Sequence, residues 1–354
     1  MAGLAPAGGR DPPDPQGLFE PGGSLAAPLS DRRAKLLPSI GAKGPPGRRL
    51  AELENDFTWS KSRHEKFQEC LRAYYYQYYG SWGGWEAEAG SRVRELYVLK
   101  KLSSRWQWAG SVVHDALKSL LARARRNGQF RSLEEVVERT RARARAQWAS
   151  SRDKSYWREA AHINGLVEHE YGEPVPNEEW RRIWNDVVEG SLRSFYASAT
   201  FEVLRRLPPE RWLVVDELDA WDFEGTKIWV ALDFAYTADD GAIHVLDWKT
   251  GREREVDRTQ LAIYTLYAEQ KWGVSAERVV GGLVYLGAGG ERASATADGE
   301  ALEACRAEMR RSIAAMRGRL DDALENRASL ERFPQLESEA KCRHCPFRRP
   351  CGRL

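Results

Sequence analysis

The sequence predicts an α/β fold whose first half is helical and whose second half forms a sheet. Helical spacing with few breaking residues extends as far as Pro208-Pro209. Strand patterns then dominate, and an almost wholly apolar run at 279–286 is typical of a buried strand. The order of helices, sheet, helix, strand and helix therefore indicates an α/β core that carries a helical insertion.

Residues 1–52 are rich in Gly, Pro and Ala and show little periodicity. A segment of this composition cannot bury enough apolar surface to offset the entropy lost on ordering, so we expect a disordered tail. It has no apolar run close to the ~18 residues that a membrane span needs, and nothing in it resembles a signal peptide. We therefore expect a cytoplasmic protein without a membrane partner.

The predicted domain covers 53–354, with order beginning near Phe57. Ser60 or Ser62 can cap a helix that continues to Tyr79. The tyrosine cluster at 74–79 could stack on nucleic-acid bases, although such a cluster is more typical of a helix packed into a core. A Gly-rich turn follows at 80–90.

The next predicted elements are helices that form an insertion at about 118–207. One opens at Trp108 and continues toward Arg126, and two further stretches have helical spacing: 132–149 and 155–199. Three strands then follow, at 211–218, 227–236 and 242–249, and after them a helix at 257–272. A strand at 279–286, a weaker strand at 291–296 and a long helix from 299 to about 327 complete the core. The sheet core is thus predicted at about 208–296, and a C-terminal helix and cysteine loop at 298–354.

Charge is distributed unevenly along a chain whose net charge is only +2. Residues 92–158 contain 17 Lys and Arg against six Asp and Glu, whereas residues 208–260 contain 13 Asp and Glu against six Lys and Arg. A basic lobe beside an acidic centre is suited to holding a polyanion over a cation. Arg-rich helices are also common as solvated surfaces, so the charge alone does not identify a partner.

The most informative segment is a predicted β-hairpin that carries two acids and a lysine. Asp247 and Lys249 are two residues apart and so point to the same face of a strand, and a turn at 239–241 can bring Asp233 alongside. Two carboxylates and an ammonium on one face make a place for a divalent metal, an attacking water and a phosphate. A surface hairpin with scattered charges is the simpler interpretation, but the apolar flanking residues favour central strands, where charges are costly without a function.

Further polar residues could complete this site. The main-chain carbonyl of Trp248 could supply a third oxygen ligand, and Glu217 could be an outer or second-metal carboxylate. His114, early in its helix, is an acceptable ligand for Mn²⁺ or Mg²⁺. Gln260 and Tyr264 share one helix face and could hydrogen-bond a phosphodiester or a base. Taken singly, these side chains are also typical of core residues, strand-end charges or incidental polar pairs.

Four of the five cysteines could form one thiolate set, with three in the tail and one far upstream: Cys342, Cys345, Cys351 and Cys70. Four thiolates suit either a [4Fe–4S] cluster or zinc, and His344 offers a competing zinc arrangement within the tail. Cys305 has apolar neighbours on a predicted helix, so we expect a core residue there. This cysteine usage favours a reducing compartment.

Together these motifs resemble the RecB-like branch of the PD-(D/E)XK nuclease superfamily, and especially its iron–sulfur members, such as the AddB C-terminal nuclease and the Cas-type adaptation nucleases. The resemblance covers about 57–354, with seven short motifs in family order: Cys70 within 62–75; Gly110 and His114; Glu217; Asp233; Asp247-Trp248-Lys249; Gln260 and Tyr264; Cys342, Cys345 and Cys351. Two positions depart from the family pattern, Val230 where Gly is frequent and Leu71 where Pro is common, and neither removes a ligand.

The resemblance implies a restriction-endonuclease-like mixed central sheet flanked by helices, with the insertion and a C-terminal iron–sulfur loop. It implies a Mg²⁺- or Mn²⁺-dependent DNA nuclease in which His114, Asp233 and Asp247 are metal ligands. Lys249 would be the catalytic lysine, and Gln260 and Tyr264 would engage DNA. It also implies that the four cysteines hold a [4Fe–4S] cluster that staples the tail to the first helix.

We therefore expect a metal-dependent exonuclease that acts on single-stranded or end-bearing DNA. Its setting would be DNA repair, recombination or defence, with a helicase or a repair or defence complex as partner. Two alternatives remain open: a catalytically silent DNA-binding or assembly subunit with the same fold, and a zinc-binding interaction protein. Metal-dependent DNA cleavage would separate a nuclease from the silent subunit. The metal content of the purified protein, iron or zinc, would separate it from the zinc-binding protein.

Overall fold

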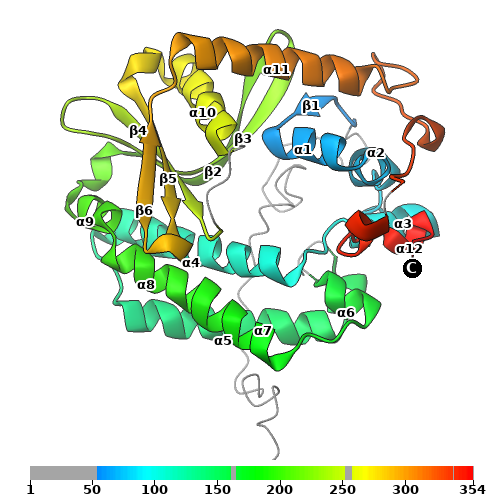
Figure 1. The fold of residues 1–354 in the computed structure, drawn as a ribbon, viewed down its shortest axis with the longest axis horizontal. Coiled ribbons are helices and arrows are strands. Elements are labelled where there is room, and N and C mark those ends of the chain that lie inside the picture. Colours follow the sequence, from blue (N-terminus) through cyan, green and yellow to red (C-terminus); the bar gives the residue numbers. More distant parts are fainter. Residues whose placement is uncertain (1–53, 161–164, 252–256, 338, 354) are drawn as a thin grey trace, which may run out of the picture.

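A mixed six-stranded sheet lies between α10 (Asp257–Trp272) and α11 (Gly299–Arg317) on one side and α4 (Arg105–Asn127) and α8 (Gly190–Ala197) on the other (Figure 1). The computed structural model describes residues 54–160, 165–251, 257–337 and 339–353, so the predicted tail at 1–52 lies outside the described residues. The strands are β1 (Thr58–Trp59), β2 (Trp212–Phe223), β3 (Thr226–Thr237), β4 (Ile243–Lys249), β5 (Val279–Tyr285) and β6 (Glu291–Ala295). The α/β fold with a mixed sheet is confirmed.

The sheet has the order β1-β3-β4-β5-β6, and β2 also pairs with β3. The pairs β2–β3, β3–β4 and β5–β6 are antiparallel, whereas β1–β3 and β4–β5 are parallel. Parallel neighbours need a crossover connection, and α10 (Asp257–Trp272) supplies it between β4 and β5. The central position of β3 and β4 places the predicted acidic hairpin inside the molecule.

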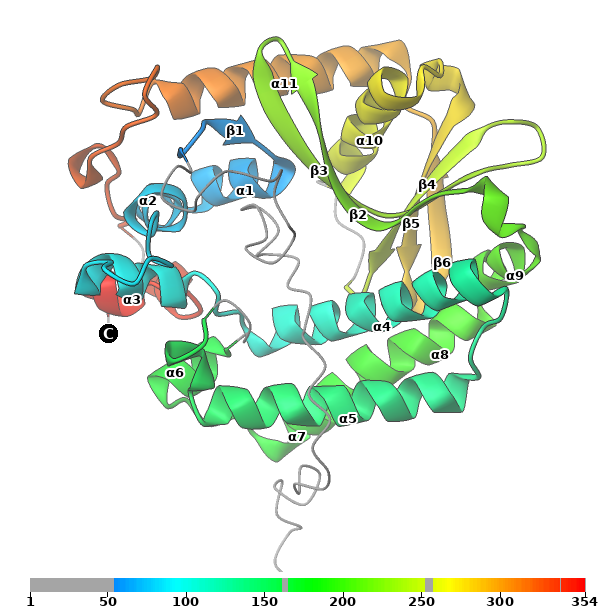
Figure 2. The same ribbon diagram turned by 180° about the vertical axis from the view of Figure 1, so that it is seen from behind.

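The two faces of the sheet have separate apolar cores. On one face, α10 and α11 (Gly299–Arg317) contribute to a cluster that contains Tyr264 and Met309. Below the other face lie three further helices (Figures 1 and 2): α4 (Arg105–Asn127), α5 (Leu133–Arg152) and α8 (Gly190–Ala197). Their cluster includes Trp248 of β4. Both faces of β4 are therefore buried, as its apolar sequence predicts.

Several helix boundaries differ from the predictions for local reasons. The helix predicted from Ser60 to Tyr79 breaks at Cys70, whose backbone is extended (φ −163°, ψ 115°). Cys70 ends α1 (Lys61–Glu69) and caps α2 (Leu71–Tyr75), which continues as a π-helical segment (Tyr76–Gly80). The cysteine thus stands at a corner between helices.

The remaining helical region is more divided than its periodicity predicts. Helix α3 (Ser91–Leu99) was not predicted, and α4 begins at Arg105 rather than Trp108 because Ser104 and Gln107 form a capping box. The stretch 155–199 contains several short elements, in chain order: a 3₁₀ turn (Ser155–Trp157), α6 (Val167–Tyr171), α7 (Asn177–Arg181), a π-helical segment (Arg182–Glu189) and α8; α9 (Ala199–Arg206) then leads to the sheet. The predicted start of the insertion, at about 118, falls inside α4.

The chain after α11 turns back across the first helices. Helix α11 ends at Arg317 rather than near 327, because the chain turns at 321–327, where Asp322 Oδ1 accepts the N–H groups of Leu324 and Glu325. Phe333 is then fully buried and packs against the rings of Tyr74, Tyr75 and Tyr79: centroid distances 5.9, 5.4 and 6.1 Å. The tyrosine cluster therefore belongs to the core, and the chain ends with α12 (Arg348–Cys351).

None of the described helices combines the length and the apolar character that crossing a bilayer requires.

Phe333→Ala should destabilise the fold strongly, because it leaves a cavity among three tyrosine rings. We expect a loss of about 4 kcal/mol in the free energy of unfolding, measured by urea titration. Leu324→Ala is the matched control, since Leu324 lies in the same segment and is 97% exposed. Equal stabilities of the two variants would contradict the packing described here.

Candidate functional site

Asp247 lies buried near the end of β4 and is held by three side chains. Tyr264 and Gln260, both on α10, donate hydrogen bonds to its Oδ1 at 2.7 and 2.9 Å. Lys249 Nζ lies 2.7 Å from Oδ2 and also donates to Gln260 Oε1 at 2.8 Å. Burial, followed by the charges of Asp247 and Asp233, raises the pKa of Tyr264 well above 10, so this phenol remains a donor. The structure thus brings together four residues that the sequence analysis selected from separate motifs.

Asp233 joins three elements from its position on β3. Its side chain is 1% exposed, and its Oδ2 accepts the main-chain N–H of Trp248 on β4 at 2.8 Å. The same oxygen lies 3.1 Å from Nδ1 of His114, which reaches it from α4. The second acid, His114 and the main chain of Trp248 are therefore also adjacent.

Helix α4 comes close to the end of β4 at Gly110. A Cβ atom added there would lie 3.2 Å from Thr250 Oγ1, a tight contact. Gly110 is one helical turn before His114, and a larger side chain there would require Thr250 to shift by a few tenths of an ångström.

The acid that the structure buries beside α4 is Asp216, which no motif in the sequence indicates. Glu217, the residue that the sequence motifs indicate, is 55% exposed in its side chain and lies 3.7 Å from Arg125. Asp216 is 8% exposed and forms an ion pair with Lys118, one turn after His114 on α4. Adjacent strand residues point to opposite faces, so an Asp-Glu pair signals that one acid points inward without showing which.

The backbone of β2 is irregular at Asp216, which has a positive φ of 50°. The β2 residues on either side of it pair with Phe234 and Leu232, so Asp233 lies in the corresponding stretch of β3. On β3, Leu232 packs with the α10 and α11 cluster, whereas Phe234 packs with the α4 cluster. Regular alternation would place these two residues on the same face of the sheet. Near Asp233 the side chains of β3 therefore change the face to which they point. A positive φ in a non-glycine residue is costly and is often retained at functional sites.

The side chains of the site suit a metal ion that takes some of its ligands from the protein and the others from water and substrate. No three His, Cys, Asp or Glu side chains in the described residues converge closely enough to form a complete metal site by themselves. Asp247 Oδ2, which lies 2.7 Å from Lys249 Nζ, is nevertheless buried without a well-directed hydrogen-bond donor from the described part of the chain. Mg²⁺ is usually held by one or two carboxylates together with waters and substrate phosphates, which suits this arrangement.

The four cysteines selected from the sequence line one small cavity, on a corner of the molecule distant in sequence from the acids: Cys70, Cys342, Cys345 and Cys351. Each is partly buried, and burial raises the pKa of Cys345 to about 11. The thiols surround this cavity without forming a site for a single ion. Cys305 is a buried core residue of α11, as expected.

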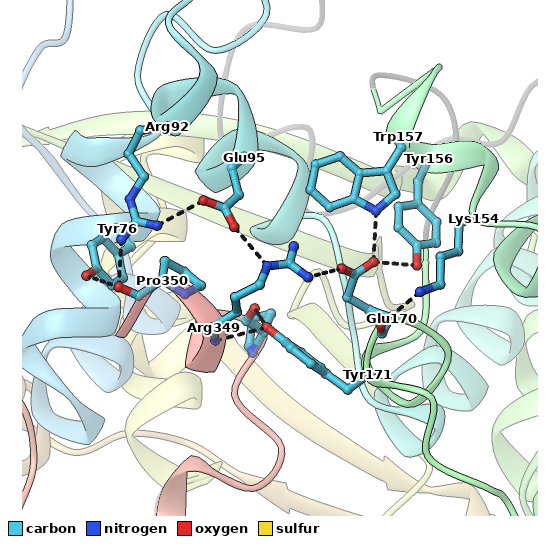
Figure 3. Close-up of polar contacts among 11 residues, drawn as sticks. Tyr76, Arg92, Glu95, Lys154, Tyr156, Trp157, Glu170, Tyr171, Arg349 and Pro350 are labelled. Atoms are coloured by element: carbon cyan, nitrogen blue, oxygen red, sulfur yellow. Dashed lines mark hydrogen bonds and ion pairs between the residues drawn. The ribbon is translucent and has the colours of Figure 1, made fainter. Parts of the chain in front are cut away.

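The tail that carries three of these cysteines is fixed to α3 and α6 by polar contacts (Figure 3). Arg349 donates to Glu95 of α3 at 2.9 Å and to the buried Glu170 of α6 at 2.7 Å. Tyr76, close to Cys70, donates to the carbonyl of Pro350 at 3.1 Å. These contacts bring the tail beside the corner at which Cys70 stands.

Comparison with known proteins agrees with this geometry. A family model described as the PD-(D/E)XK nuclease superfamily matches residues 58–352, so the chain belongs to this superfamily. Its members are phosphodiesterase nucleases that use divalent metals, and the family implies DNA as the substrate. The mixed sheet flanked by helices is consistent with the family fold. A search of curated proteins finds no match.

Lys118→Met should destabilise the protein, because the buried Asp216 carboxylate loses its ammonium partner. We expect a loss of about 3 kcal/mol in the free energy of unfolding. Arg125→Met is the matched control on the same helix, since its pair with Glu217 is solvent-exposed and should change stability by less than about 1 kcal/mol. Urea titration of both variants checks the difference, and a reversed order of stabilities would overturn the assignment of Asp216 as the buried acid.

Proposed function

We propose that this member of the PD-(D/E)XK superfamily is a Mg²⁺- or Mn²⁺-dependent deoxyribonuclease that acts as an exonuclease on single-stranded or end-bearing DNA. The observation that carries the proposal is the pair of buried carboxylates, Asp233 and Asp247, on adjoining strands beside Lys249. Mg²⁺ is usually held by one or two carboxylates together with substrate phosphates, and an ammonium beside the acids suits a phosphate. A bound metal would offset the charge of the acids, and the phosphate would belong to the substrate.

The metal would be held by donors from β3, β4 and α4: Asp233, Asp247, His114 and the main-chain carbonyl of Trp248. When bound, the ion would polarise the scissile phosphate and make water nucleophilic near neutral pH. Lys249 can orient the attacking water and offset negative charge that develops on the phosphoryl oxygens.

Gln260 and Tyr264 support this site in different ways. Tyr264 is 1% exposed and donates to Asp247, so we assign it to positioning that carboxylate. Gln260 is only partly buried and bonds both Asp247 and Lys249, so it can also meet DNA as the substrate approaches. The basic helices within 92–158 would follow the phosphate backbone without regard to base sequence.

We further propose that Cys70, Cys342, Cys345 and Cys351 hold a [4Fe–4S] cluster. The support is that all four thiols line one cavity, since a cluster of this kind is held by four thiolates. Such a cluster would join the tail to the corner between α1 and α2. Within a cell, a nuclease of this kind would act in DNA repair, recombination or defence, together with a helicase or a repair or defence complex.

Asp247→Ala should lower the rate of DNA cleavage in Mn²⁺ by about 10²–10³-fold, because it removes a central charge of the site. The measurement is a time course on end-labelled linear and circular DNA, single- and double-stranded, with products resolved by length. Asp240→Ala, which changes an exposed acid of the β3–β4 turn, should cleave normally.

Undiminished cleavage by Asp247→Ala would contradict the assignment of the active site, and cleavage of circular DNA would contradict exonuclease action. Absence of cleavage by the parent chain would instead favour a silent DNA-binding subunit.

Anaerobically purified protein should be brown and contain about four irons per chain. Cys345→Ala should lose the colour and iron, and should also unfold at a lower temperature because the tail is released. Cys305→Ala is the matched control, since this thiol is buried in α11 away from the cavity. Colourless protein that contains zinc would rule out the cluster.

A further inference from the structure

A second polar cavity lies between α1, α2, the start of α4 and the cysteine tail. Its volume is about 340 Å³, and several cationic and amide side chains line it: Lys66, Lys100, Lys341, Gln77 and Gln107. None of these residues belongs to the proposed active site. The cavity therefore needs its own explanation.

Apart from its cysteine thiols, the side chains that line the cavity carry an excess of positive charge. Its two carboxylates already have lysine partners, at 2.6 and 2.5 Å: Glu65–Lys61 and Glu69–Lys66. Within the described residues, no carboxylate forms an ion pair with Lys100 or Lys341. Two ammonium groups thus remain for an anion.

Lys100 is the unusual member of this set, because it is a buried charge. It is 6% exposed, and its Nζ lies 5.1 Å from the centre of the Tyr97 ring. Burial, followed by repulsion from Lys101, lowers the pKa of Lys100 to about 7. A buried ammonium is costly unless it is paired, and an aromatic ring face offsets only part of this cost. An oxyanion in the cavity would offset the remainder.

The cavity is adjacent to the acidic site along one face of α4. Gln107 lines it, and His114 is seven residues later, two turns along the same face. The distance along the helix axis is about 10 Å. A nucleic-acid strand that reaches the acids can therefore place a neighbouring phosphate in the cavity.

We propose that this cavity binds a phosphate group of the nucleic-acid strand a few nucleotides from the scissile bond, with Lys100 and Lys341 as its cationic partners. The inference rests on the proposed nuclease function and adds a second point of attachment for the strand. The rival role for Lys100 is to balance the charge of the thiolates, because Cys70, Cys342 and Cys345 line another wall. The extension of the cavity to Gln107, toward His114, favours the strand.

Binding measured without divalent metal tests the proposal apart from cleavage. The probe is a fluorescein-labelled oligothymidylate of about 12 nucleotides, with affinity followed by anisotropy across a series of salt concentrations in EDTA. Lys100→Met and Lys341→Met should each weaken binding and lower the slope of log affinity against log salt by about 0.7, the value for one phosphate contact on a single strand. Lys341 is exposed, so its replacement tests the site even if Lys100→Met does not fold.

Lys101→Met is the matched control, because Lys101 is equally buried over the same ring but does not line the cavity. Its salt slope should equal that of the parent when measured at about pH 6, where Lys100 is protonated with or without repulsion from Lys101. Inorganic phosphate at matched ionic strength distinguishes the source of the phosphate, since a strand site should be displaced only weakly by the free ion. Strong displacement would overturn the assignment to a strand.

Unchanged slopes for both cavity variants would also overturn the proposal, as would loss of iron from Lys100→Met without any change in DNA binding. That last result would assign Lys100 to the thiolates. A parent chain that does not bind the oligonucleotide at all would instead count against the proposed nuclease function.

Discussion

The burial of two carboxylates at the centre of a sheet is the constraint on which the rest of the site depends. Asp233 and Asp247 are 1% and 5% exposed, so water cannot solvate them, and the protein must supply donors instead. These donors are the N–H of Trp248 on β4, a lysine on the same strand, and the amide and phenol of α10, while the imidazole of α4 lies 3.1 Å from Asp233. Helices from both sides of the sheet are thereby tied to one point.

The irregular β2–β3 ladder explains how helices on opposite faces can serve the same site. A regular strand would present its side chains to each layer in strict alternation. The change of face near Asp233, in the stretch of β3 that corresponds to the strained Asp216, relaxes that rule where the acids lie. Lys118 then ties Asp216 to α4, one turn from His114. The strain in β2 and the placement of the imidazole thus belong to a single arrangement.

The C-terminal tail shows a comparable dependence on distant partners. Phe333 packs among the tyrosines of the first helices, and Arg349 links the tail to acids of α3 and α6 (Figure 3). These contacts join residues that are more than 170 positions apart in the chain. These contacts bring Cys342, Cys345 and Cys351 near Cys70, at the break between α1 and α2. The tail residues that follow Phe333 also form one wall of the lysine-lined cavity.

The sequence by itself determined the fold class, the positions of most strands and the residues that meet at the acidic site. It could do so because apolar periodicity is local, and because Asp247 and Lys249, or Gln260 and Tyr264, share a face by spacing alone. It could not determine the break at Cys70, the helix at 91–99 or the early end of α11, which depend on capping and turn contacts. Only the tertiary structure decided between Asp216 and Glu217, since the choice depends on a positive φ and on Lys118 of another element. The buried Lys100 was equally hidden, because a lysine in sequence gives no sign of the cavity that surrounds it.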